Sequence, residues 1–479
     1  MADTYQTLIM PGSLINGQWH KSEQTFSVKN KTNSEIIATL SNAKPEDMET
    51  AVEQATAAFA QWRNTTGAER SRLLMAWYNK LMEHREALAT LLTLEQGKPL
   101  AEAKGEIDYG AGYVRWFAGE AERIYGDICD GLHHGQSVNV IKKPVGVVGA
   151  ITPWNFPNAM IARKAAAALA AGCTFVGRPA SETPLSALAM AKLAQEAGIP
   201  DGVLNIVTGT DARKLGKVLT QSPQVAKFSF TGSTRVGQQL IQDCASTVKR
   251  VSMELGGNAP FIVFDDADIE AAVDGAMLAK FRNAGQTCVC ANRFLVHRQC
   301  HDAFVSALAE KMRTLSVGDG LDAADMGPLI STQAANNVHE LVSQAIAEGA
   351  TCDYSRKWDN SAFYPPTLLT GVNTSMRIFN EEIFGPVVTV TPFDEEQEAI
   401  TLANQTKYGL AAYLYTQDYT RIRRVADQLD VGMVGINDAA ISNPAAPFGG
   451  VKQSGFGREG SKYGLDDYLS LQYRCLGGY

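Results

Sequence analysis

The strongest constraint on the fold is a regular alternation of short apolar runs and helical stretches that begins near residue 144. Strands are predicted at 145–151, 174–177, 203–207 and 226–230, and helices at 159–171, 184–197 and 212–220. A further helix opens after Gly232. Strands that alternate with helices are typical of a parallel sheet covered by helices on both faces. The chain is therefore predicted to have an α/β fold.

A second α/β segment follows Gly256, with strand, helix and strand predicted at 260–264, 268–281 and 293–296. Ahead of the alternation, apolar residues recur every three or four positions and predict two long amphipathic helices at 47–63 and 68–96. Because 479 residues exceed one ordinary domain, two or three domains are expected.

Charge and cysteine usage narrow the class of protein. The net charge of −8 is spread along the chain without a basic tract, which argues against a nucleic-acid partner. The alanine-rich run 165–171 is too short to span a membrane, and the N-terminus does not resemble a signal peptide. Eight scattered cysteines favour a reduced cytoplasmic protein. No metal site is predicted, because the histidines number only seven and neither a CxxC nor an HxxxH pair is identified.

Two motifs suggest acyl-transfer chemistry. Cys288 follows a Gly-Gln-Thr turn, where its thiol is presented rather than packed away. About thirty residues earlier, Glu254 precedes the pair Gly256-Gly257, which permits a tight bend or a close approach to a ligand. A thiolate attacks a carbonyl, and a carboxylate activates the water that later releases the acyl group.

Both motifs resemble those of the aldehyde dehydrogenase superfamily, and the resemblance runs from about residue 15 to the C-terminus. Five further blocks occur in the family's order: Leu94–Lys98, Pro153–Pro157, Phe230–Thr234, Glu381–Pro386 and Pro447–Gly450. The most similar branch is that of the succinate-semialdehyde dehydrogenases. This resemblance implies oxidation of an aldehyde to an acid with a nicotinamide cofactor.

The resemblance also implies the domain organisation. A Rossmann-type cofactor domain is expected at 1–125 and 145–255, and an α/β catalytic domain at 256–456. A small β oligomerisation element is expected at 126–144 and 457–479, where a hairpin joins the C-terminal strand. A homodimer or homotetramer is the corresponding assembly.

A dinucleotide site is predicted without a GxGxxG motif. Gly232 and Ser233 open a helix after a strand, where backbone N–H groups and the helix dipole favour a phosphate. The resemblance adds cofactor contacts at Trp154, Arg178, Pro179, Ala180, Ser181, Leu255, Glu382 and Phe384. Arg178 replaces the family's usual lysine, and Ser181 replaces a glutamate that repels a 2′-phosphate, so NADP is favoured and NAD remains possible. Glu182 is expected to point elsewhere. The alternative is that Arg178 is a neutral replacement.

For catalysis the resemblance implies three residues. Cys288 is the nucleophile, Asn155 stabilises the oxyanion together with the Cys288 N–H, and Glu254 activates water. Cys290 is either a packing residue or the partner of Cys288 in a reversible disulfide. Lys98 is interpreted as part of a helix end and is not assigned to the site.

The substrate is predicted from three positions that match carboxylate-binding residues of the branch: Arg163, Arg282 and Ser442. Two guanidinium groups and a hydroxyl fix a carboxylate, which favours succinate semialdehyde. Glutarate semialdehyde or another carboxylated or aromatic aldehyde is the alternative, since the small run 438–440 leaves room for a longer or bulkier acid.

Three different functions also fit parts of the pattern: a CoA-acylating dehydrogenase, a thiol hydrolase and a non-catalytic binding or structural protein. The intact Glu254 argues against the first, because hydrolysis of a thioester needs a base. The lack of a clear histidine partner for Cys288 argues against the second. The presence of Cys288, Glu254 and Asn155 together argues against the third.

Overall fold

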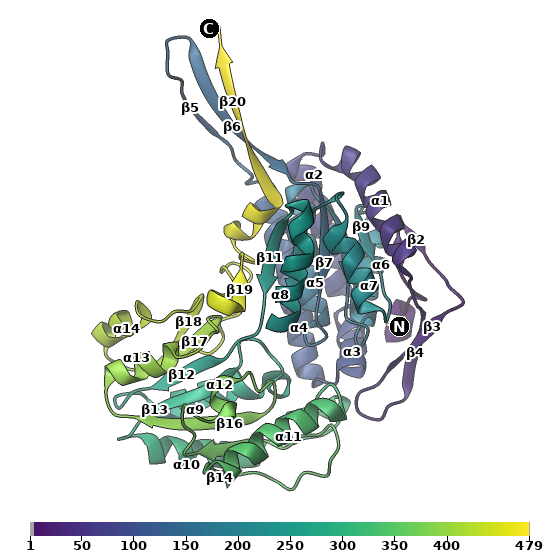
Figure 1. The fold of residues 1–479 in the computed structure, drawn as a ribbon. Helices are drawn as coiled ribbons and strands as arrows, with labels where there is room; N and C mark the ends of the chain where they lie inside the picture. The colour runs from purple at the N-terminus through teal and green to yellow at the C-terminus, as the bar shows by residue number, and fades with distance from the viewer. Residues whose placement is uncertain (1–3, 479) are drawn as a thin grey trace.

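The structure is a computed structural model that describes residues 4–478. Its larger sheet has the strand order β19-β11-β10-β7-β8-β9-β1-β2 (Figure 1). The five strands from β11 to β9 are parallel, and antiparallel strands flank them on both sides. The strands are β1 (Leu14–Ile15), β2 (Gln18–Trp19), β7 (Val147–Ile151), β8 (Thr174–Arg178), β9 (Leu204–Ile206), β10 (Val225–Thr231), β11 (Arg250–Glu254) and β19 (Gly455–Phe456). The predicted parallel sheet is confirmed.

Helices cover both faces of this sheet, because successive strand residues point to opposite sides. Val148 packs in a core with helices α2 to α6, whereas its neighbour Val147 packs in a separate core with α1, α7 and α8. The helices are α1 (Pro45–Trp62), α2 (Gly67–Glu83), α3 (Arg85–Gln96), α4 (Leu100–Ala121), α5 (Pro157–Ala171), α6 (Leu185–Glu196), α7 (Ala212–Gln221) and α8 (Thr234–Cys244). Two separate cores thus sandwich one sheet, as the α/β prediction requires.

The single long helix predicted at 68–96 is wrong. The structure has two helices, α2 and α3, which meet at His84, where φ is −99° and ψ is 15°. Leu81 and Leu88 are both buried in the same core on either side of the break. The apolar periodicity therefore continues across His84, which is why the pattern alone does not reveal the interruption.

The second sheet has the order β14-β15-β16-β13-β12-β17-β18 and is parallel except for β14. The predicted strand, helix and strand after Gly256 are confirmed as β12 (Ala259–Val263), α9 (Ile269–Phe281) and β13 (Ala291–His297). Its other strands are β14 (Thr351–Tyr354), β15 (Thr367–Thr370), β16 (Val387–Phe393), β17 (Ala411–Tyr415) and β18 (Met433–Ile436). Its other helices are α10 (His301–Thr314), α11 (Thr332–Ala347), α12 (Arg377–Asn380), α13 (Glu396–Asn404) and α14 (Tyr419–Ala426).

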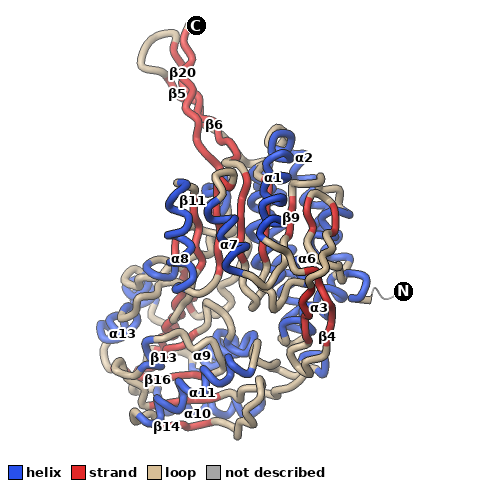
Figure 2. The backbone as a smooth tube through the Cα atoms, turned by 45° about the vertical axis from the view of Figure 1, so that its right-hand side comes forward, coloured by secondary structure: helices blue, strands red, loops and turns tan. Residues whose placement is uncertain are grey.

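A three-stranded arm projects from the body of the molecule (Figures 1 and 2). It is formed by β5 (Asp127–Asp130), β6 (Gln136–Pro144) and β20 (Leu469–Gly477), and β6 pairs with β20 over its whole length. The predicted pairing of the hairpin with the C-terminal strand is confirmed. A separate hairpin consists of β3 (Thr25–Lys29) and β4 (Ile36–Ser41). Short 3₁₀ helices span Tyr5–Leu8, Ala245–Thr247, Arg282–Gly285, Gly320–Asp322, Lys452–Ser454 and Lys462–Tyr468.

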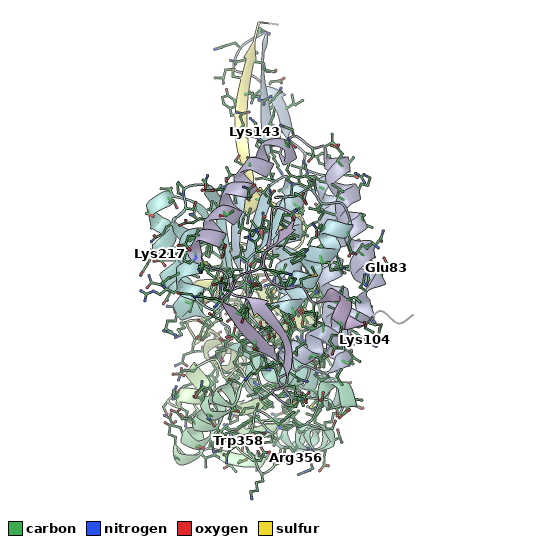
Figure 3. All side chains as sticks on the ribbon, turned by 90° about the vertical axis from the view of Figure 1, so that its right-hand side faces the viewer. Glu83, Lys104, Lys143, Lys217, Arg356 and Trp358 are labelled. Carbon is green, nitrogen blue, oxygen red and sulfur yellow. The ribbon has the colours of Figure 1, made fainter. Side chains whose placement is uncertain are left out.

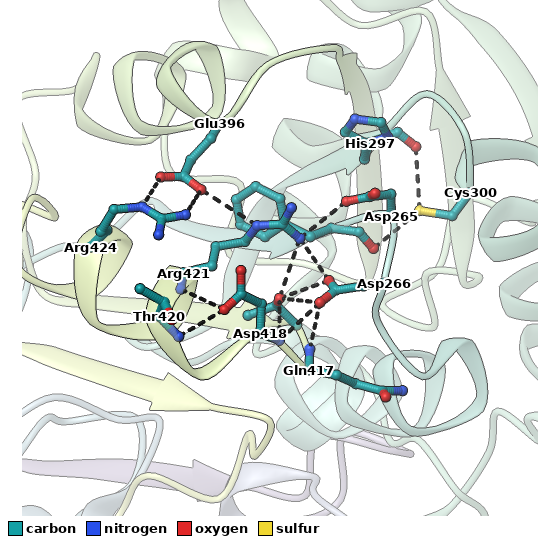
Figure 4. A network of polar contacts seen from close by, with 12 residues as sticks. Asp265, Asp266, His297, Cys300, Glu396, Gln417, Asp418, Thr420, Arg421 and Arg424 are labelled. Atoms are coloured by element: carbon teal, nitrogen blue, oxygen red, sulfur yellow. Dashed lines mark hydrogen bonds and ion pairs between the residues drawn. The ribbon is translucent and has the colours of Figure 1, made fainter.

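A polar network ties α13 and α14 to the end of β12 (Figure 4). Arg421 donates to Asp266 at 2.8 Å and to Asp265 at 3.1 Å, and its guanidinium lies 4.6 Å from the ring centroid of Phe264. Glu396 on α13 accepts a bidentate pair of hydrogen bonds from Arg424 on α14. Bidentate geometry makes this network a stronger fastening than isolated surface pairs.

The remaining surface carries mixed charge, as the labelled side chains of Glu83, Lys104 and Lys217 illustrate (Figure 3). Over residues 4–478, none of the helices has the length and apolar character needed to traverse a bilayer.

Candidate active site

A cavity of about 270 Å³ lies where three parallel strands of the first sheet end. β7, β10 and β11 finish at Ile151, Thr231 and Glu254, and the carboxyl ends of parallel strands are the usual position for ligands in α/β proteins. Segments of the second sheet's part of the chain close the cavity from the other side. Its lining residues are Pro153, Trp154, Asn155, Thr231, Gly232, Ser233, Glu254, Leu255, Gly256, Cys288, Glu382 and Phe384.

Cys288 reaches this cavity from a turn. The N–H of Cys290 donates to the carbonyl of Thr287 at 3.0 Å, which places Cys288 at the second position of the turn, and its side chain is half-buried. Asn283 and Ala284, just upstream, hold positive φ angles of 52° and 53°, an uncommon conformation for residues other than glycine. Burial raises the pKa of the Cys288 thiol to about 12, with Arg163 acting against the shift. The thiol is therefore protonated at neutral pH in the absence of a base.

Asn155 lies between β7 and α5 on the same cavity. Its side-chain nitrogen donates to the carbonyl of Gln286 at 3.0 Å, and its side-chain oxygen accepts from the N–H of Phe156 at 3.1 Å. A primary amide has two N–H bonds, so one donor remains for a ligand. The structure thus brings a thiol and an amide donor to one cavity.

Glu254 is the last residue of β11 and is only 3% exposed. Neither of its carboxyl oxygens has a hydrogen-bond partner among the described residues. Burial, followed by the negative charge of Glu459, raises the pKa of Glu254 to about 8, and Arg163 and Lys164 oppose this shift. An unpartnered carboxyl with a pKa near neutrality suits a general base.

Glu382 and Phe384 form another wall. Glu382 accepts a hydrogen bond from the N–H of Gly257 at 3.1 Å, and burial raises its pKa to about 7. A Cβ on Gly256 would lie 2.6 Å from a carboxyl oxygen of Glu382, so a larger residue there would displace that carboxylate. Phe384, at a φ of 54°, meets Trp154 edge to face with ring centroids 5.5 Å apart. Strained backbone of this kind is typical of ligand sites.

The N-terminus of α8 contributes residues both to this cavity and to a larger one of about 670 Å³. Gly232 and Ser233 line the first cavity, and Ser233 caps α8 by accepting from the N–H of Val236 at 3.4 Å. The larger cavity is rich in cationic side chains: Arg178, Arg213, Lys217 and Arg235. Two cavities on either side of a helix N-terminus suit an elongated dinucleotide, whose phosphates such a terminus favours.

Arg178 lies at the end of β8, followed by Pro179 and Ala180. It is 5% exposed and donates to the carbonyl of Gly209 at 3.0 Å, while its Nε has no partner among the described residues. The expectation that Glu182 points elsewhere is wrong, because the Ser181 hydroxyl donates to the Glu182 carboxylate at 3.1 Å. The physical reason is local: an exposed hydroxyl beside a carboxylate takes the charged acceptor.

Two of the three predicted substrate residues lie together. Arg282 and Ser442 line a small cavity of about 50 Å³, together with Thr287 and Val289, which flank Cys288, and with Ala439 and Ala440. Arg163 lines neither this cavity nor the one that contains Cys288. It is 1% exposed and forms an ion pair with Glu459, although its Nη2 atom has no partner among the described residues.

Glu459 is a buried acid that was not predicted from the sequence. Burial alone would raise its pKa, but Arg163 and Lys164, which both pair with it, hold the pKa below its ordinary value. A signal was present, since two consecutive cations on an otherwise apolar, buried helix require an acidic partner.

The sequence places Lys98 at a helix end, and the structure adds a contact with the candidate site. α3 does end here, at Gln96, and is capped by Gly97, whose φ is 99°. The Lys98 side chain, however, is fully buried and donates to the backbone carbonyl of Asn155 at 2.8 Å. The available signal was the spacing of four between Lys98, Glu102 and Glu106, which predicts one charged face at the start of the next helix.

Cys290 is 2% exposed, and its sulfur lies 3.7 Å from the carbonyl oxygens of Lys280 and Ala291.

One HxxxH spacing does occur, at His297 and His301, and these side chains contact the carbonyl of Asp394 and the carboxylate of Asp302. Within the part of the chain that the structure describes, no group of three or more His, Cys, Asp or Glu side chains could hold a metal.

Comparisons with known proteins agree with this geometry. The model of the aldehyde dehydrogenase family matches residues 19–473. A 3-sulfolactaldehyde dehydrogenase of Pseudomonas putida is 51% identical over 98% of both chains. The NADP(+) succinate-semialdehyde dehydrogenase GabD of Escherichia coli (strain K12) is 50% identical over 97% of both chains. A crystal structure described as that of an E. coli NADP-dependent enzyme has a TM-score of 0.97 and 49% identity, and covers 98% of this chain and 99% of its own.

Proposed function

The chain belongs to the aldehyde dehydrogenase family, and we propose that it oxidises succinate semialdehyde to succinate with NADP+ as the preferred acceptor. It is an NAD(P)-dependent oxidoreductase. The observation that carries the substrate proposal is the small cavity that Arg282 and Ser442 share beside the turn of Cys288. A guanidinium and a hydroxyl bind a carboxylate and leave the other end of a short substrate near the thiol.

The proposed reaction begins at the Cys288 thiol. Because burial keeps this thiol protonated, a base must take its proton, and Glu254 on the same cavity is the candidate. The thiolate attacks the aldehyde carbon, and the resulting oxyanion of the thiohemiacetal is stabilised by the free N–H of Asn155 and the N–H of Cys288. NAD(P)+, when bound, would supply the hydride acceptor needed to oxidise this adduct to a thioester.

Glu254 then performs the second half of the reaction. It first releases to solvent the proton taken from Cys288, and as a carboxylate it then takes a proton from water, whose oxygen attacks the Cys288 thioester. The carbon–sulfur bond breaks, the carboxylic acid leaves, and the thiol is regenerated. Both carboxyl oxygens of Glu254 lack a partner among the described residues, so either can accept a hydrogen bond from that water.

The cofactor proposal assigns the cavities on either side of the α8 N-terminus to one dinucleotide. Gly232 and Ser233 would face the phosphates, and Glu382 would hold the nicotinamide ribose. Trp154, Leu255 and Phe384 would enclose the nicotinamide. Arg178, with Pro179, Ala180 and Ser181, would hold the adenosine ribose. The unpartnered Nε of Arg178 supports a 2′-phosphate and hence NADP, whereas the Glu182 carboxylate beside Ser181 works against it.

Arg163 remains a proposed substrate ligand through its unpartnered Nη2, and Cys290 a proposed redox partner of Cys288.

A homodimer or homotetramer is proposed from the projecting arm, whose strands leave large apolar side chains such as Ile128 and Leu471 exposed. The proposed domains keep the ranges expected from the sequence for the cofactor, catalytic and oligomerisation parts. All eight cysteines are free thiols, which suits a cytoplasmic protein.

The deciding experiment compares kcat/KM for four aldehydes with NADP+ and NAD+ in separate assays. The aldehydes are succinate semialdehyde, glutarate semialdehyde, 3-sulfolactaldehyde and the neutral butanal. We expect succinate semialdehyde with NADP+ to be fastest and butanal to be slowest. The 3-sulfolactaldehyde dehydrogenase relative makes the sulfonate the second candidate, because a sulfonate is also an anion at the far end of a short aldehyde. Butanal faster than all three anions would refute the anion-binding proposal.

A further inference from the structure

The junction of α3 and α4 carries a buried cation that the mechanism above does not use. Lys98 follows the left-handed Gly97, and its side chain is 0% exposed. Its Nζ lies 2.6 Å from a carboxyl oxygen of Glu106, 2.8 Å from the carbonyl oxygen of Asn155 and 3.8 Å from the ring centroid of Phe156. Besides its own counter-ion, Lys98 thus contacts the Asn155-Phe156 dipeptide.

Glu106 extends this contact to the start of α5. Its Oε2 pairs with Lys98, and its Oε1 accepts from the N–H groups of Asn158 at 2.9 Å and Ala159 at 3.2 Å. These N–H groups lie in the first turn of α5, where intrahelical acceptors are missing. The ion pair therefore holds both the residue before α5 and the beginning of the helix itself.

The same junction also forms hydrogen bonds with the loop that precedes Cys288. Glu102 accepts from the N–H of Asn283 at 2.7 Å, and Gln96 donates to the side-chain oxygen of Asn283 at 2.9 Å. The side-chain nitrogen of Asn283 in turn donates to the carbonyl of Asn155 at 3.0 Å. Since Asn283 has a φ of 52°, these bonds hold it in a conformation that it would not favour alone.

We propose that Lys98 is a positioning residue that fixes the Asn155 amide relative to the Cys288 thiol through the Asn155 carbonyl. The proposal rests on the proposed role of Asn155 as an oxyanion donor. Two donors, Lys98 Nζ and Asn283 Nδ2, converge on this one carbonyl oxygen and set the plane of its peptide. The direction of the Asn155 side chain follows from that plane. A donor displaced by a fraction of an ångström no longer meets the developing oxyanion.

The test is a double-mutant cycle between Lys98→Met and Asn155→Ala, with kcat measured on succinate semialdehyde and on butanal. Lys98→Met keeps the apolar stem and removes the ammonium. We expect it to lower kcat by about 10- to 100-fold on both aldehydes, with the KM for NADP+ unchanged. In the Asn155→Ala background the same change should lower kcat by no more than about twofold, because the group on which it acts is gone.

Two further variants keep the test informative. Lys98→Met leaves Glu106 without its cation, so Lys98→Met/Glu106→Gln removes the buried pair together and retains an acceptor for α5. Lys249→Met is the matched control: Lys249 is also a buried lysine, and it donates to the carbonyls of Leu219 and Ser222. We expect the Lys98→Met/Glu106→Gln variant to lose kcat as Lys98→Met does, and Lys249→Met to keep wild-type kcat.

Alkylation of Cys288 by iodoacetamide separates positioning from loss of structure, because this reaction forms no oxyanion. We expect Lys98→Met to alkylate within about twofold of wild type while its turnover falls. Alkylation slowed as much as turnover would overturn the proposal, as would an equal effect of Lys98→Met in the wild-type and Asn155→Ala backgrounds. A wild-type enzyme inactive on every aldehyde would instead refute the proposed function, which is a distinguishable result.

Discussion

Arg163 and Glu459 form an ion pair whose side chains are 1% and 5% exposed, and both charges act on the pKa of Glu254. The arginine proposed to bind substrate is therefore also part of the electrostatic surroundings of the proposed base. Arg282, in contrast, has no ion pair among those found in residues 4–478 and lines the small cavity with Ser442. The two arginines should consequently respond differently to mutation.

We expect Arg282→Met to raise the KM for succinate semialdehyde about tenfold or more and to spare butanal, since a hydrogen bond to a charged group contributes about 1.5–3 kcal/mol. Arg163→Met should raise the same KM and also lower the free energy of unfolding by about 3 kcal/mol, because it breaks a buried pair. Steady-state kinetics and urea unfolding measure the two effects. A loss at Arg163 that is equal on both aldehydes would mean a purely structural role.

The raised pKa of Glu254 predicts a pH dependence for thioester hydrolysis. Because the base must be deprotonated, its active fraction falls about tenfold per pH unit below about 8 and is full above it. kcat should therefore rise with pH and level off above about pH 8 where hydrolysis limits turnover. Because Glu254 is also the proposed base for the Cys288 thiol, Glu254→Gln should slow both the first-turnover formation of NADPH and the steady-state rate. A full steady-state rate in this variant would remove Glu254 from the mechanism.

The raised pKa of Glu254 also predicts how the stability of the folded protein changes with pH. The folded state holds the Glu254 proton up to about pH 8, whereas an unfolded glutamate releases it near its ordinary pKa of 4.5. The unfolded state thus binds fewer protons between these values, and the contribution of Glu254 to stability falls as pH rises through this window. Urea unfolding of wild type and Glu254→Gln at several pH values should show that the variant loses less stability between about pH 5 and 8. Parallel pH profiles for the two proteins would contradict the raised pKa.

Arg178 and Glu182 are expected to act in opposite directions on cofactor choice. Arg178→Gln should lower kcat/KM with NADP+ by roughly 10- to 100-fold and change that with NAD+ little, because only NADP+ carries the 2′-phosphate. Glu182→Gln should raise the preference for NADP+ a few-fold, since a carboxylate held 3.1 Å from the Ser181 hydroxyl is removed. An equal loss of kcat/KM with both cofactors in Arg178→Gln would mean that Arg178 has a structural role.

Cys290 tests the redox proposal. Its N–H closes the turn that presents Cys288, but its thiol is buried beside the carbonyls of Lys280 and Ala291. A disulfide between Cys290 and Cys288 therefore requires the turn to open. Peroxide then accepts two electrons from the two thiols, and the thiol protons become part of the water that forms. Wild type should lose activity in peroxide and recover in reductant, whereas Cys290→Ala should lose activity and recover less. Identical recovery in both would end the proposal.

Much of the fold was accessible from the sequence because its signals are local. The strands at 174–177 and 226–230 and the helix at 212–220 follow from apolar periodicity, which burial on one or both faces imposes residue by residue. The break at His84 was not predicted, because the periodicity continues across it. The later strands of the second sheet, such as β15 and β16, were not predicted either.

The chemistry is encoded in short stretches of sequence: a presented thiol at Cys288, a carboxylate at Glu254 and a glycine-led helix at Gly232 each depend on a few adjacent residues. The partners of buried charges, in contrast, emerge only when the chain has folded. Lys98 meets Asn155 across 57 positions, and Lys164 meets Glu459 across 295. Such pairs form because a charge removed from water must find a counter-charge wherever the fold brings one, and no short-range pattern specifies that distance.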